Sequence, residues 1–193
     1  MEDERDVSNY GLDKVSSHPY GAYKIRSNFA RRIISWFYWK FKGDSRNFLL
    51  KSMPKNSICA EIGIFKGDFT KQIIKVVKPN LLHLIDIDTS KLSSELNSNH
   101  QLTIHEGDSK NVLNEFDDNY FDWVYIDGDH SYAAVKLDLE LCLRKVKKSG
   151  FITGDDYENH YFGVIKAVTE FLDKNTSVAL LEIKETQFIL QKR

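Results

Sequence analysis

The stretch SICAEIGIFKGD, residues 57–68, decides the fold. Its first half, Ser57–Gly63, is typical of a buried strand, and a helical pattern follows over 67–77. Gly63 ends the strand pattern and Gly67 opens the helical one; glycine at such a turn lets a ligand approach the backbone closely. The spacing Glu-x-Gly-x-x-x-Gly differs from the Gly-x-Gly-x-x-Gly of nicotinamide-binding folds. The stretch therefore predicts a ligand-binding loop or, as the plainer alternative, an ordinary strand-to-helix turn.

Strand and helix patterns alternate from this stretch onward. The predicted strands are 57–63, 81–87, 102–106, 121–127 and 151–155, and the predicted helices are 67–77, 89–97, 109–116, 131–147 and 162–174. Two last strands, 178–183 and 187–191, follow each other without a helix. This order predicts an α/β fold with a mostly parallel sheet, helices on both faces and a C-terminal antiparallel β-hairpin. In such sheets ligands bind at the carboxyl ends of the strands, so residues that follow strands are the candidates for a site.

Composition is that of a globular chain with a real core. The 193 residues are 41% hydrophobic and 28% charged, which excludes disorder over most of the length and indicates one domain with a short appendage. The two cysteines have no paired Cys or His spacing, so a structural zinc site is not expected. The first residues are acidic and polar, without the pattern of a secretory signal, and no apolar run is long enough to span a membrane. We therefore expect a cytoplasmic protein.

Two acidic residues stand where the second and third strands end. Asp86 comes about 20 residues after the glycine loop, a spacing that suits a carboxylate accepting both hydroxyls of a ribose. Asp108, between Gly107 and Ser109, suits the amino group of an adenine. The alternative interpretation, that Asp108 is the N-cap of the helix predicted from residue 109, is nearly as strong.

Three more carboxylates follow the fourth and fifth strands. Asp127 ends one strand, and Asp155 and Asp156 end the next, so neighbouring strands would bring them to one edge of the sheet. Carboxylates so close repel each other, and a divalent cation removes that repulsion. Oxygen ligands favour Mg²⁺ or Ca²⁺; the alternative is that some of these acids cap helices or face water. His130, three residues after Asp127, is a candidate general base, although a lone loop histidine is usually only solvated.

Taken together, these motifs resemble a known family. They are Glu61-x-Gly63-x-x-x-Gly67, Asp86, Gly107-Asp108-Ser109, the string IDGDHSY at 126–132, and Gly154-Asp155-Asp156-Tyr157. The set resembles class I S-adenosylmethionine-dependent methyltransferases, in the branch of macrocin-type O-methyltransferases and proteins near cephalosporin hydroxylase. The resemblance covers roughly residues 55–193. It implies a Rossmann-like sheet of seven strands in which the hairpin inserts one strand antiparallel.

The resemblance also implies roles for individual residues. The cofactor-binding residues would be Glu61, Gly63, Phe65 and Gly67 for the methionine part, Asp86 for the ribose, and Asp108 or Ser109 for the adenine. Asp127, Asp155 and Asp156 match the metal ligands. Asp127 and His130 would be catalytic, with His130 at the place where catechol-type relatives carry a lysine base.

The implied activity is methyl transfer from S-adenosylmethionine to a hydroxyl of a small molecule or sugar, with Mg²⁺ or another hard divalent cation. A non-catalytic S-adenosylmethionine-binding or membrane-peripheral module on the same fold is the alternative. An oxidoreductase is disfavoured by the glycine spacing.

The N-terminal part of the chain differs from the rest. We expect residues 1–55 to form an arm and a basic aromatic helix, ahead of a methyltransferase domain over 56–193. Residues 14–56 carry ten Lys or Arg against one acid, although the whole chain has a net charge of −1. Residues 22–42 place Ile25, Phe29, Ile33, Phe37 and Phe41 on one helix stripe.

Three interpretations of that helix stay open. It packs on the domain or on a second copy in a homodimer, it covers the acceptor site, or it lies on an anionic membrane at the inner face with Trp36 and Trp39 at the headgroups. Nucleic acid is not an expected partner, because the sequence pI is near 6.6.

Overall fold

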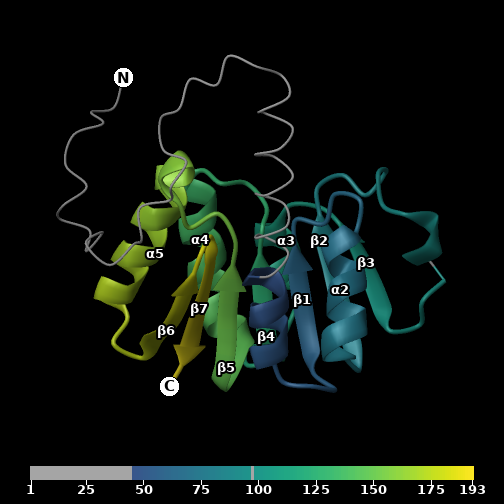
Figure 1. Cartoon of the computed structure of the whole chain (residues 1–193), viewed down its shortest axis with the longest axis horizontal. Helices are drawn as coiled ribbons and strands as arrows, with labels where there is room; N and C mark the ends of the chain where they lie inside the picture. Colours follow the sequence, from purple (N-terminus) through teal and green to yellow (C-terminus); the bar gives the residue numbers. More distant parts are fainter. Residues whose placement is uncertain (1–44, 97) are drawn as a thin grey trace, which may run out of the picture.

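The protein is described here by a computed structural model that covers residues 45–96 and 98–193 (Figure 1). The strands are β1 (Ile58–Ile62), β2 (Leu81–Asp86), β3 (Leu102–Glu106), β4 (Phe121–Ile126), β5 (Val146–Gly154), β6 (Val178–Lys184) and β7 (Gln187–Lys192). The α-helices are α2 (Asp68–Val77), α3 (Ser109–Asn114), α4 (Tyr132–Lys145) and α5 (Phe162–Lys174), with short 3₁₀ turns η3 (Ser94–Leu96) and η4 (Asn159–Tyr161). Residues 45–52 are also helical.

The seven strands form one sheet in the order β3-β2-β1-β4-β5-β7-β6. Strands β1 to β5 pair in parallel, while β7 is antiparallel to both β5 and β6. Figure 1 shows β1 and β5 pointing the same way and β7 reversed. The predicted Rossmann-like α/β fold, including the antiparallel strand of the terminal hairpin, is confirmed.

Alternation of side chains along the strands builds one core on each face of the sheet. On one face Ala60 and Ile62 of β1 pack with residues of α3, α4 and α5. On the other face Cys59 of β1 packs with α2 and with Leu49 and Leu50 of the helix at 45–52. Because both faces are covered, the central strands β1, β2 and β4 are buried along most of their length.

Residues 45–53 contribute to this core although they precede the domain predicted over 56–193. Leu49 and Leu50 are fully buried, and Met53 is 3% exposed. The basic aromatic helix predicted over 22–42 and the arm before it lie outside the described residues. The division at residue 55 stays a prediction.

Two local predictions are wrong. The helix predicted over 89–97 is not formed, and its described part contains only the 3₁₀ turn η3. The reason is that side chains there bind locally instead: Asp88 accepts a hydrogen bond from the Ser90 backbone at 3.0 Å, and the Thr89 hydroxyl donates to Glu106. The helix predicted over 131–147 ends at Lys145, because Val146 is already extended and pairs with Phe121 as the first residue of β5.

A histidine pair lies under α3 in one of the two cores. His83 of β2 is 5% exposed. Its Nδ1 lies 2.9 Å from Nε2 of His105 on β3, and its Nε2 lies 3.3 Å from the Tyr120 hydroxyl. Burial lowers the pKa of His83 to about 4, and the neighbouring His105 ring adds to this effect. His83 is therefore neutral in the folded protein over a pH range in which it is protonated in the unfolded chain.

This difference predicts acid sensitivity. Above pH 6.5 His83 is neutral in both the folded and the unfolded chain, so it does not reduce the stability of the fold. As the pH falls from about 6.5 toward 4, only the unfolded chain takes up the proton, and the free energy of unfolding decreases. Between pH 7.5 and 4.5 His83 should cost about 2–3 kcal/mol of the free energy of unfolding. In His83→Gln, which can still hydrogen-bond but does not titrate, urea unfolding should show a flatter dependence on pH. An unchanged pH dependence would show that other groups cause the acid sensitivity.

Candidate functional site

A cleft of about 670 Å³ opens at the carboxyl ends of the central strands. It lies at β1, which pairs with β2 on one side and with β4 on the other. The strand order reverses direction at this point, which makes it the topological switch point of the sheet. Its walls come from the loops after β1, β2, β3 and β4 and from the first turns of α4. This is the place where open α/β sheets bind ligands, and the volume is within the usual range of about 300–1,000 Å³ for small-molecule sites.

Residues 63–66 of the glycine loop form one wall of the cleft, whereas Gly67 is not among the residues that line it. Gly63 has a φ of +85° and Gly67 a φ of +81°, which side chains other than glycine rarely adopt. A Cβ on Gly63 would lie 2.2 Å from the carbonyl oxygen of Asp127, so the loop after β1 passes directly against the loop after β4. Phe65 also lines the cleft, with a positive φ and 59% of its surface exposed.

Asp86 holds this loop in place. Its Oδ2 accepts hydrogen bonds from the backbone of Ile64 at 2.7 Å and of Phe65 at 3.1 Å. The carboxylate therefore fixes the shape of the glycine loop while also lining the cleft. Its contact with a ribose stays a prediction.

Glu61 is a buried carboxyl group at the base of the cleft. It is 1% exposed, and Thr70 at the start of α2 donates a hydrogen bond to it at 2.7 Å. Burial raises the pKa of Glu61 to about 8. A positive charge that enters the cleft would favour the ionised form of the Glu61 carboxyl group. This property is consistent with the predicted position of Glu61 beside the methionine part of a cationic cofactor.

The two residues predicted to contact the adenine, Asp108 and Ser109, line the cleft just after β3. Asp108 is the N-cap of α3 and accepts a hydrogen bond from Lys110 N at 2.8 Å, so the capping interpretation is confirmed. Ser109 donates to Oδ1 of Asp138 at 2.7 Å. Asp138 is buried in α4, and burial raises its pKa to about 6. Sequence reasoning missed Asp138, although a polar residue one turn after Val135 on an apolar helix stripe was the available signal.

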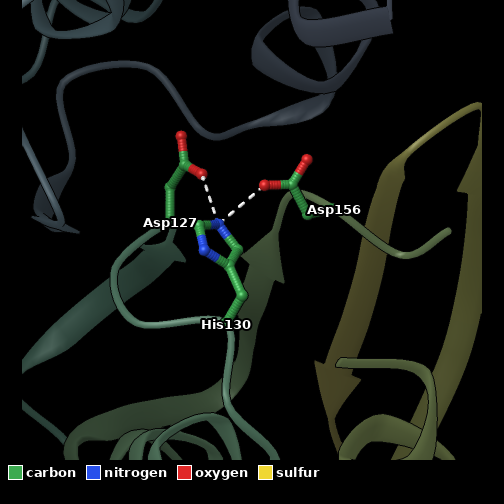
Figure 2. A group of neighbouring side chains, drawn as sticks. All are labelled: Asp127, His130 and Asp156. Carbon is green, nitrogen blue, oxygen red and sulfur yellow. Dashed lines mark ion pairs between the residues drawn. The ribbon is translucent and has the colours of Figure 1, made fainter. Parts of the chain in front are cut away.

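The ends of β4 and β5 bring an acidic cluster together with His130. Asp127 follows β4, and Asp156 follows the neighbouring parallel strand β5. Ligand atoms of Asp127, His130 and Asp156 all lie within 4.8 Å of one another. Figure 2 shows both carboxylates turned toward the same ring nitrogen. The predicted convergence of these strand ends is therefore present.

His130 is the centre of this group. Its Nε2 lies 2.6 Å from Oδ2 of Asp156 and 3.7 Å from Oδ1 of Asp127, and its ring stacks on Tyr161 with 4.6 Å between ring centroids. Despite these short distances, the described residues give this buried nitrogen no hydrogen bond of regular geometry. The carboxylates of Asp127 and Asp156 raise the pKa of His130 to about 10. The imidazole thus occupies the position of a cation between two carboxylates.

Asp155 is not a member of this group, although it shares Arg46 with Asp127. Its Oδ1 accepts hydrogen bonds from the Thr186 hydroxyl at 2.6 Å, from the Gln187 amide at 2.5 Å and from Asp156 N at 2.7 Å. Its Oδ2 accepts from Arg46 Nη2 at 2.5 Å and Nε at 3.1 Å. The third predicted ligand is thus engaged by other partners, which the turn between β6 and β7 and the helix at 45–52 supply.

Arg46 is a second residue of the cleft that sequence reasoning missed. Its guanidinium bonds Asp127 at 2.7 Å as well as Asp155, and it lies 4.8 Å from the centre of the Phe69 ring. It also lines the cleft, beside Glu61. In the sequence it is one of ten basic residues in the N-terminal segment, and no spacing distinguishes it from the others.

Comparison with known proteins agrees with this geometry. Residues 60–157, just over half of the chain, match a family model described as a methyltransferase domain. No curated protein matches the sequence.

Solved structures show the same fold at low identity. The O-methyltransferase TomG from Streptomyces achromogenes, involved in tomaymycin synthesis and solved in complex with S-adenosylmethionine, has a TM-score of 0.60 and 17% identity over 78% of each chain. A provisionally named rRNA methylase from Clostridium thermocellum has a TM-score of 0.60 and 16% identity, over 79% of this chain and 97% of the other. A provisionally named hemolysin from Lactococcus lactis has a TM-score of 0.60 and 15% identity, over 79% of this chain and 86% of the other.

Proposed function

The chain belongs to the methyltransferase domain family, and we propose that it transfers the methyl group of S-adenosylmethionine to a hydroxyl of a small molecule or sugar with the help of a divalent cation. The family supports S-adenosylmethionine as the methyl donor. The proposal of metal-assisted transfer to a hydroxyl depends on two features that lie together at one edge of the sheet. These are the cleft bounded by the glycine loop and the group of Asp127, His130 and Asp156 beside it.

The two ends of the cleft determine the orientation in which the methyl donor binds. The acceptor must reach the methyl group, so the sulfonium belongs near Glu61 and Asp127. The nucleoside then extends past Asp86 toward Ser109, which follow β2 and β3, the strands on the other side of β1 from the strands that carry the acidic group. The left-handed Gly63 leaves backbone, and no side chain, against the loop after β4.

The residues present fit a divalent ion. Asp127 and Asp156 offer carboxylate oxygens, and the buried Nε2 of His130 faces them without a regular hydrogen bond. The two carboxylates suit Mg²⁺ or Mn²⁺, and the imidazole favours a transition-metal ion such as Mn²⁺ over Mg²⁺. When bound, such an ion would lower the pKa of the acceptor hydroxyl and orient its oxygen toward the methyl group. We propose Asp127, His130 and Asp156 as the ligands, in place of the set that included Asp155; the ion would take the place of the proton that the two carboxylates hold on the His130 ring.

The other residues of the site then hold the reactants. Glu61 places a carboxyl group near the charge that disappears as the methyl group moves. Asp86 keeps the glycine loop in the shape that admits the donor. Positioning two reactants in this way accounts for a large part of the rate of many transfer reactions.

A labelling experiment tests this function. The full chain is incubated with S-adenosylmethionine carrying an isotopically labelled methyl group, a mixture of sugars and phenolic small molecules, and Mg²⁺. We expect mass spectrometry to find labelled methyl ethers that EDTA suppresses. Label that appears in RNA or protein would refute the proposed acceptor class. Donor binding without any transfer would favour the non-catalytic module.

A further inference from the structure

Arg46 stands out because it comes from outside the region that matches the methyltransferase family. That region begins at residue 60, whereas Arg46 lies on the helix at 45–52. Leu49 and Leu50 on the same helix are fully buried against the sheet, so the position of Arg46 is fixed by the core. Its side chain is 15% exposed, and the guanidinium reaches carboxylates that follow two different strands.

The contacts of Arg46 are those of a counter-ion. Nη2 lies 2.7 Å from Oδ2 of Asp127 and 2.5 Å from Oδ2 of Asp155. These two carboxylates belong to the acidic edge that, on charge alone, requires a cation. Asp127 presents its other oxygen, Oδ1, toward His130. One carboxylate therefore links Arg46 to the group proposed to bind the metal.

We propose that Arg46 is the built-in cation of this site. Its positive charge permanently compensates the negative charges of Asp155 and of the Asp127 oxygen that faces it. A divalent ion would then bind only the other oxygen of Asp127 together with His130 and Asp156. The inference rests on the proposed function for the identity of that second group, but its test requires neither the methyl donor nor an acceptor.

The test asks whether a metal ion can replace the charge of Arg46. Arg46→Met keeps an unbranched chain over Phe69 and removes the charge, while Arg46→Lys keeps a charge and serves as the matched control. In EDTA, Arg46→Met should lower the melting temperature of the full chain by about 10 °C, because the buried carboxylate of Asp155 and the partly exposed one of Asp127 lose a compensating positive charge. Adding Mg²⁺ or Ca²⁺ should recover at least half of that loss, and NaCl of equal ionic strength should not.

Metal affinity gives a second, independent measurement. Titration calorimetry with Mn²⁺ should show Arg46→Met binding at least about tenfold more tightly than the natural protein, since one positive charge next to Asp127 is gone. Arg46→Lys should stay within about threefold of the natural protein, because an ammonium group at this place keeps the charge.

Three outcomes would overturn the inference. They are equal thermal recovery by divalent ions in Arg46→Met, Arg46→Lys and the natural protein, weaker Mn²⁺ binding in Arg46→Met, or equal behaviour of Met and Lys. If Arg46→Met does not fold in EDTA, Arg46→Gln, which can still donate to Asp155, is measured the same way. Failure of the proposed function has a different signature, namely a natural protein that binds no S-adenosylmethionine while the Arg46 variants still show divalent recovery.

Discussion

Gly63→Ala will destabilise the protein by at least about 3 kcal/mol and abolish binding of the methyl donor. Gly63 has a φ of +85°, so any side chain there is strained. The new Cβ would also lie 2.2 Å from the Asp127 carbonyl oxygen and 2.7 Å from Gly128 N. These are backbone atoms of the neighbouring loop, and the Asp127 amide is already bound to the Ile62 carbonyl at 2.8 Å. The two loops must therefore separate, which deforms the cleft.

Gly128→Ala is the matched control for this change. Gly128 lies in the same cleft, but a Cβ there would meet only Cγ2 of Ile62 at 3.6 Å, an ordinary contact. Urea unfolding should place Gly128→Ala within about 1 kcal/mol of the natural protein. A Gly63→Ala variant that is as stable as Gly128→Ala would contradict the described geometry of the glycine loop.

Asp156→Asn will weaken divalent-cation binding by at least about 100-fold and leave binding of S-adenosylmethionine nearly unchanged. Asp156 has a φ of +59°, a conformation that asparagine tolerates well, so the substitution removes charge without straining the backbone. Its Oδ2 lies 2.6 Å from His130 Nε2, at the centre of the proposed ligand group. The measurement is calorimetric titration with Mn²⁺, followed by titration with the methyl donor.

Asp129→Asn is the control for loss of charge near the cleft. Asp129 lies on the same loop as His130 and accepts a hydrogen bond from Ser131 N at 2.8 Å, outside the proposed ligand group. Its variant should bind Mn²⁺ within about threefold of the natural protein. Equal losses of metal and methyl donor in Asp156→Asn would mean that this acid serves the cofactor or the fold instead.

Most of the sheet follows from local patterns. The strand predicted over 102–106 forms β3 with the same bounds, because Leu102 and Ile104 alternate with polar residues in a short segment between turns. The convergence of Asp127 and Asp156 could be predicted too, since both follow strands and neighbouring parallel strands end at one edge. The helix predicted over 89–97 failed because Asp88 and Thr89 bind nearby groups with their side chains, which periodicity alone does not show.

The inner partners of the site could not be read in the same way. Arg46 reaches Asp155 across 109 residues of sequence, and Gln187 reaches the same carboxylate from the opposite side, 32 residues later in the chain. Such pairs arise from the packing of elements that no local pattern connects. Asp155 was predicted as a metal ligand because its place in the sequence resembles that of a family ligand. Its hydrogen bonds to Thr186 and Gln187 depend on how the terminal hairpin packs, which the sequence pattern does not show.

The most direct test of the central claim is calorimetric titration of the full chain with S-adenosylmethionine. The account predicts a single site with a dissociation constant between micromolar and sub-millimolar, abolished in Gly63→Ala and retained in Asp156→Asn. An absence of binding at millimolar donor, with the natural protein folded, would contradict it.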